Sequence, residues 1–143
     1  MRIRFGNLGD LGDMQKTILF DTNVLIDFWK DSSKLKELEV STKKYALCGV
    51  VRSEFLHGAK SNSEIDGMLK IFASFDNLPN DDYDFDGVGF MLQTLRKNGY
   101  TIPFSDAMIA FTAIKYDVPL WTHDRHFEIL RAFYPELTLY KNE

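Results

Sequence analysis

Four acidic side chains that lie far apart along the chain are candidates for metal-dependent chemistry: Asp21, Glu54, Asp106 and Asp124. Carboxylate oxygens are the ligands that Mg²⁺ and Mn²⁺ prefer in proteins. Four carboxylates packed closely would repel one another and raise each other's pKa, unless a cation compensates their charge. These residue types therefore predict a site for Mg²⁺ or Mn²⁺, provided that the fold brings the four together.

Apolar runs and helical patterns alternate along the chain. The apolar runs predict strands at 17–20, 45–51, 118–122 and 137–140. Helical spacing and end signals predict helices around 25–29, from Ser63, from Asp84 or Asp86 to Asn98-Gly99, from an N-cap at Ser105 to Tyr116, and at 127–133. Strands that alternate with helices are typical of an α/β domain with a mainly parallel sheet.

This arrangement explains how the four acids can meet. Asp21 directly follows the first predicted strand, and Asp124 lies just past the third. We expect Glu54 in the first turn of the helix after the second strand, and Asp106 at the start of a later helix. Helix capping and the helix dipole are enough to explain a single acid at the start of a helix. The carboxyl ends of parallel strands share one edge of a sheet, so the four together favour a binding site there.

Composition limits the classes of protein to consider. The chain has 143 residues, 45% of them hydrophobic and 14% aromatic, which suits one globular domain. No apolar run approaches the roughly 20 residues that cross a bilayer, and the single cysteine, Cys48, predicts a free thiol in a reducing compartment. We therefore expect a cytoplasmic protein with no membrane contact. The net charge of −4 argues against a broad nucleic-acid-coating surface, but metal ions could hold a phosphate at an acidic site.

The first residues differ from the rest of the chain. Glycines at 6, 9 and 12 interrupt residues 1–16, which we interpret as a leader or N-terminal extension. Residues 17–143 are then a single domain, and translation could start at Met1 or at Met14.

Four segments resemble, in order, the motifs of PIN-domain nucleases. These are Phe20–Ile26, Ser53–Gly58 with Glu54 as the acid, Ile102–Ala110 and Leu120–Phe127. The match runs from about Thr17 to Tyr140. It implies a PIN-like three-layer α/β/α domain with a mainly parallel central sheet, in which Asp21, Asp106 and Asp124 hold the metal and Glu54 helps directly or through water.

Length and short loops are most similar to VapC, the toxins of bacterial and archaeal type II toxin–antitoxin pairs. The resemblance implies a Mg²⁺- or Mn²⁺-dependent endoribonuclease that cleaves RNA by metal-activated water and is held inactive by a small antitoxin. It also implies a homodimer. Two alternatives stay open: a housekeeping PIN nuclease that processes RNA without an antitoxin, and a non-catalytic PIN-like module that binds RNA.

Neighbouring polar residues are candidates for supporting roles. Thr22, Asn23 and Thr122 could orient the carboxylates or a phosphate, or could simply cap the strand ends. Arg125 and His126, which flank the fourth acid, are candidates for RNA contact. A surface for a dimer could come from Phe72, Phe75 and Phe90, although we expect these rings to be buried in the core.

Two other motifs in the sequence are incomplete. Residues 82–87 match the first half of a calcium-binding EF-hand loop, but its twelfth position, normally a bidentate Glu, is Gln93. Asp21-Thr22-Asn23 is also similar to the opening motif of haloacid-dehalogenase phosphatases, in which a second Asp acts as general acid. Asn23 stands in its place, which leaves a phosphatase only as a distant alternative.

Overall fold

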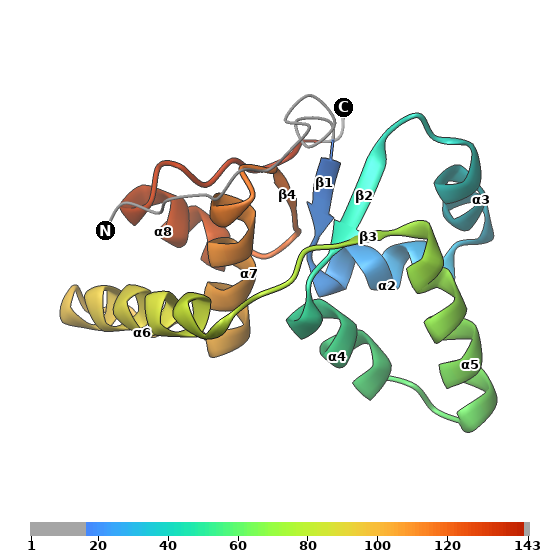
Figure 1. The fold of residues 1–143 in the computed structure, drawn as a ribbon, viewed down its shortest axis with the longest axis horizontal. Coiled ribbons are helices and arrows are strands. Elements are labelled where there is room, and N and C mark those ends of the chain that lie inside the picture. Colours follow the sequence, from blue (N-terminus) through green and yellow to red (C-terminus); the bar gives the residue numbers. More distant parts are fainter. Residues whose placement is uncertain (1–16, 142–143) are drawn as a thin grey trace.

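The computed structural model describes residues 17–141 (Figure 1). The predicted extension at 1–16, with both candidate start sites, lies outside the described residues. The strands are β1 (Thr17–Phe20), β2 (Lys44–Leu47), β3 (Asp76–Asn77) and β4 (Leu120–Trp121). The helices are α2 (Thr22–Lys30), α3 (Ser32–Val40), α4 (Gly49–His57), α5 (Asn62–Ile71), α6 (Asp82–Lys97), α7 (Phe104–Lys115) and α8 (His126–Phe133), with a 3₁₀ turn η1 (Phe72–Ser74) after α5.

The four strands form one sheet in the order β3-β2-β1-β4, and every neighbouring pair is parallel. The chain moves from β1 through β2 to β3, then crosses back to place β4 on the other side of β1. Right-handed crossovers therefore put α2 to α5 on one face and α6 to α8 on the other, as Figure 1 shows. The predicted three-layer α/β/α fold is confirmed.

Strand β1 lies at the centre of this sheet. All four of its residues are buried, as expected for a parallel strand covered by helices on both faces. The ring of Phe20 lies within 5.3 Å, centroid to centroid, of four other aromatic rings, those of Phe28, Tyr45, Phe75 and Trp121. This aromatic core fixes the end of β1, and so positions the residue that follows it.

The second strand is shorter than predicted. It ends at Leu47, and the apolar residues Val50 and Val51 belong to α4. The apolar run in the sequence extends from β2 into α4. It does so because Val51, on the inner face of α4, is fully buried like the strand before it. Glu54 consequently lies in the second turn of a helix rather than in its first turn, which corrects the sequence-based placement.

Several boundaries also differ from the prediction. Ser105 is inside α7, which starts at Phe104 after Pro103 and has no side-chain cap. Helix α5 is capped by Ser61 rather than opened by Ser63, and α6 begins at Asp82. The predicted strand at 137–140 is reduced to a single parallel bridge between Leu120 and Leu139.

The three phenylalanines that could form a dimer surface differ in their exposure to solvent. Phe72 is buried and Phe75 is half-buried, but Phe90 is 62% exposed. The expectation that Phe90 packs in the core is therefore wrong. None of the helices between residues 17 and 141 combines the length and apolar character needed to span a bilayer.

Candidate active site

Asp21 is the N-cap of α2 and directly follows β1. Its carboxylate accepts two hydrogen bonds, from the Thr22 backbone N–H at 2.7 Å and from Thr122 Oγ1 at 2.6 Å. The residue is only 5% exposed. Aspartate is a favoured N-cap, but a capping side chain is usually solvated. A buried carboxylate at the end of a central strand is the first sign of a binding site.

Thr122 joins this carboxylate to the loop after β4. Its Oγ1 donates to Asp21 and accepts from the Asp124 backbone N–H at 3.0 Å. Strand order reverses between β1 and β4, because the chain leaves β1 toward β2 and returns on the other side. Ligands of open parallel sheets bind at such a point, beyond the carboxyl ends of the strands.

Asp106, in the first turn of α7, and Asp124 lie on either side of His126. The ring nitrogen Nδ1 of His126 lies 2.8 Å from Asp106 Oδ2 and 3.4 Å from Asp124 Oδ1. The backbone N–H of His126 also donates to Asp124 Oδ1 at 2.9 Å. The donor atoms of these three side chains all lie within 4.8 Å of one another. The structure thus brings two of the predicted acids together and adds a histidine.

Glu54 reaches the same place from α4. Its Oε1 accepts a hydrogen bond of 2.7 Å from Thr22 Oγ1, and Thr22 in turn donates its backbone N–H to Asp21. Glu54 is exposed, whereas Asp21 is buried. The glutamate therefore lies at the open side of the cluster, joined to its buried member through Thr22.

The electrostatics of the cluster follow from burial and from the closeness of these groups. Burial raises the pKa of Asp21, hydrogen bonds from the two threonines oppose the rise, and the charges of Asp106 and Glu54 add to it. The pKa of Asp106 is raised chiefly by burial and further by the negative charges of Asp124 and Glu54. The hydrogen bond to Asp106 raises the pKa of His126. Crowded negative charge is the common feature of the site.

The residues present fit a divalent cation. Apart from His126, the donor set consists of carboxylate oxygens, the hard ligands that Mg²⁺ and Mn²⁺ prefer. Between residues 17 and 141, no Lys or Arg side chain lies within 4 Å of these four carboxylates, so no permanent positive charge compensates them. A bound cation would supply that charge.

The supporting residues fall into two groups. Thr22 and Thr122 contact the acids directly, but Asn23 accepts instead from the His123 backbone N–H at 3.3 Å and so holds the loop after β4. Arg125 is exposed at the start of α8. His126, a candidate for RNA contact, instead places its ring against Asp106. Sequence reasoning missed this pairing because the two residues are 20 positions apart in the sequence, although Asp106 is a predicted acid and His126 lies beside another, Asp124.

Comparison with known proteins shows the family to which the chain belongs. The pattern of the PIN domain family matches residues 18–132. Ribonuclease VapC1 of Methanocaldococcus jannaschii is 33% identical over 121 residues, which cover 83% of this chain and 85% of that protein.

Solved structures with a similar fold include VapBC2 of Rickettsia felis bound to a DNA fragment from its promoter, with a TM-score of 0.69 and 21% identity. VapBC-1 of nontypeable Haemophilus influenzae gives a TM-score of 0.70 and 20% identity. Each match covers 87% of this chain and 97% of the chain compared. From the family pattern and the VapC1 match together, the chain belongs to the PIN-domain family and, within it, to the VapC-like proteins.

Proposed function

We propose that this protein is a metal-dependent endoribonuclease and the toxin of a toxin–antitoxin pair. Two observations support the proposal. Donor atoms of Asp106 and Asp124 lie within 4.8 Å of each other, and Thr22 joins Asp21 to Glu54 at the switch point of the sheet. The 33% identity to a protein named Ribonuclease VapC1 supports the reaction class. An enzyme of this kind acts in the cytoplasm, on RNA.

Each acid has a defined part in the proposed reaction. Asp21, Asp106 and Asp124 hold one or two Mg²⁺ or Mn²⁺ ions, and Glu54 assists directly or through water. When bound, the ion supplies positive charge that polarises the phosphodiester and lowers the pKa of a nearby water molecule. The threonine hydroxyls fix the carboxylates before the substrate arrives, which limits the reorganisation needed during cleavage. The products carry a 5′ phosphate and a 3′ hydroxyl.

The proposed partners are an antitoxin and a second copy of the chain. Solved relatives of the same fold include a toxin–antitoxin complex from Klebsiella pneumoniae, at 21% identity and a TM-score of 0.64. A surface for self-association is available where Phe90, 62% exposed, and Tyr100, 42% exposed, lie near the half-buried ring of Phe133. Size-exclusion chromatography with light scattering measures the oligomer directly.

Two other functions within the family are distinguished by simple tests. A housekeeping RNA-processing nuclease would cleave RNA but would have no small inhibitory protein encoded beside it. A binding module would retain RNA without cutting it. The presence of all four acids in one cluster favours an enzyme over a binding module, because binding alone requires no crowded carboxylates.

Cleavage of a mixed pool of tRNA and structured RNA tests the proposal. The protein is incubated with Mg²⁺, Mn²⁺ or EDTA, and the ends of the products are identified. We expect cleavage with either metal, none in EDTA, and 5′-phosphorylated products. Cleavage that persists in EDTA, or 2′,3′-cyclic phosphate ends, would contradict metal-activated hydrolysis.

A further inference from the structure

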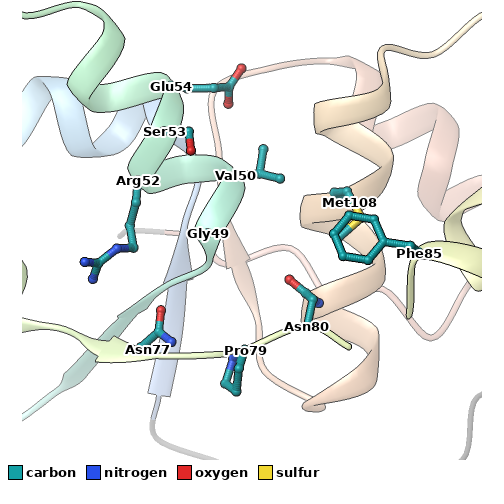
Figure 2. Close-up of a pocket in the computed structure, with 10 residues that line it drawn as sticks. All are labelled: Gly49, Val50, Arg52, Ser53, Glu54, Asn77, Pro79, Asn80, Phe85 and Met108. Atoms are coloured by element: carbon teal, nitrogen blue, oxygen red, sulfur yellow. The ribbon is translucent and has the colours of Figure 1, made fainter. Parts of the chain in front are cut away.

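A groove that includes Glu54 lies between α4 on one side and α6 and α7 on the other (Figure 2). Its volume is about 770 Å³, within the ~300–1,000 Å³ typical of sites for small ligands. Glu54 and Val50 line the groove from α4, while Phe85 and Met108 line it from α6 and α7. Because Glu54 belongs to both, the groove and the acid cluster form one continuous surface.

The groove carries an arginine, Arg52, whose side chain stacks on an aromatic ring. The guanidinium of Arg52 is stacked over the ring of Phe72, 4.3 Å from its centroid. No carboxylate between residues 17 and 141 lies within 4 Å of that guanidinium. Stacking holds the side chain in place, and its planar guanidinium carries five N–H donors that suit the oxygens of a phosphate.

Exposed aromatic rings form the other side of this surface. Phe85 is 48% exposed and Phe104 is 51% exposed, and their rings are nearly parallel, at 14° with centroids 6.4 Å apart. Phe104 begins α7, and Asp106 lies in the first turn of the same helix, so the pair lies at the helix end that carries this acid. Packing does not require two large rings to face water together, whereas bases of single-stranded RNA stack on such rings.

Two asparagines add hydrogen-bonding groups along β3 and the loop after it. Asn80 donates to Asp84 and to Thr112, so its position is fixed. Asn77 is exposed and lines the groove, and its amide can both donate to and accept from the edge of a base. A cation, a flat ring and an amide are the three groups that recognise the phosphate, face and edge of a nucleotide.

We propose that this groove binds one unpaired nucleotide of the RNA substrate beside the bond that is cut, with its base on Phe85 and its phosphate at Arg52. The assignment rests on the proposed function and deepens it, because it makes the substrate single-stranded at this position. A base within a duplex is stacked on its neighbours and cannot turn its face to Phe85.

Fluorescence of 2-aminopurine tests the assignment without relying on turnover. A short single-stranded RNA that contains a cleavage site mapped with the wild-type protein carries 2-aminopurine on either side of the cut bond. It is titrated in Mg²⁺ with Asp106→Asn, which is expected to leave it intact. We expect quenching at one of the two positions and loss of that quenching in the added variant Phe85→Leu, with affinity about tenfold lower.

The arginine is tested by the dependence of binding on salt. Arg52→Gln, in the same background, is expected to weaken binding and to lower the slope of log affinity against log salt by about one. Matched controls are Tyr83→Leu and Arg96→Gln, which are exposed on α6 and do not line the groove. The controls should retain quenching, affinity and salt slope, and thermal melting checks that all variants are folded.

The possible outcomes separate this assignment from the proposed function. If the wild-type protein cleaves the RNA but Phe85→Leu and Arg52→Gln bind it as tightly as the controls do, the substrate takes another path. The assignment is then wrong while the nuclease proposal stands, and a peptide partner becomes the better occupant of the groove. If the wild-type protein cleaves no RNA, both proposals fail.

Discussion

The hydroxyl of Thr122 donates a 2.6 Å hydrogen bond to the buried carboxylate of Asp21, 101 positions earlier in the chain. The same hydroxyl accepts from the Asp124 backbone N–H. One side chain therefore sets the relative position of two candidate metal ligands that follow the neighbouring strands β1 and β4. Such outer partners of metal ligands commonly contribute about 10- to 100-fold to metal affinity or activity.

Thr122→Val removes both hydrogen bonds and keeps the shape of the side chain. We expect Mn²⁺ affinity and RNA cleavage each to fall by about 10- to 100-fold, because Asp21 would lose its donor and the loop after β4 would lose its anchor. Titration with Mn²⁺ followed by electron paramagnetic resonance measures the affinity. Thr122→Ser keeps the hydroxyl and should behave almost as the wild type does. Equal loss in both variants would show that packing, and not the hydroxyl, matters.

Asp21→Asn tests the electrostatic strain of the metal-free site. Burial and the charges of neighbouring carboxylates raise the pKa of Asp21, so its ionised form is disfavoured in the folded protein. Asparagine is neutral and is an equally good N-cap. In EDTA near neutral pH, we expect the variant to melt at a higher temperature than the wild type while its RNA cleavage is lost. A variant that unfolds would identify Asp21 as a structural acid.

The ion pair between Asp84 and Lys115, outside the cluster of four acids, predicts a large contribution to stability. The Lys115 ammonium lies 2.6 Å from Asp84 Oδ2, and the two side chains are 20% and 8% exposed. Lys115→Met would leave a buried carboxylate without its cation, so we expect the free energy of unfolding to fall by about 3 kcal/mol. Urea denaturation measures this change. Lys97→Met, exposed at the end of α6, is the control and should change little. A midpoint equal to that of the control would contradict the argument.

The capping box at the start of α6 predicts how stability changes in acid. The Asp81 carboxylate accepts from the Asp84 backbone N–H at 2.9 Å, and this hydrogen bond is the main cause of its lowered pKa. A lowered folded-state pKa means that the ionised carboxylate stabilises the fold above its unfolded value of 3.8, and that the contribution disappears as pH falls through the folded-state value.

Asp81→Ala should therefore melt at a lower temperature than the wild type at pH 7, and the difference should shrink toward zero below pH 3.8. Calorimetry at a series of pH values measures both proteins. Asp82→Ala, at the next position and also exposed, is the matched control, with a smaller difference at pH 7. A difference that persists unchanged in strong acid would mean that Asp81 acts without its charge.

The sequence predicted the positions of three acids best, because each acid directly follows or begins a clearly patterned element. Asp21 and Asp124 follow buried strands, and Asp106 starts an apolar helix, so simple alternation of elements was enough to place them at one edge. Glu54 was placed in the wrong turn because apolar residues of β2 and α4 form one uninterrupted run. The periodicity of such a short run cannot separate a buried strand from the buried face of a helix.

The elements that were missed leave little trace in the sequence. Helix α3 has no buried residue, so no apolar stripe marks it. Strand β3 consists of the two exposed polar residues Asp76 and Asn77, and only its pairing with β2 makes it a strand. The hydrogen bond between His126 and Asp106 also depends on tertiary contacts, as does the stacking of Phe85 on Phe104.

The most direct test of the central claim compares RNA cleavage by the wild-type protein, Asp106→Asn and Asp66→Asn in Mg²⁺ or Mn²⁺. Asp66 is exposed on α5 and serves as the matched control for the loss of one negative charge. If the four acids form a metal-dependent nuclease site, the wild type and Asp66→Asn cleave equally and Asp106→Asn, though folded, does not. Equal cleavage by all three proteins would contradict the account.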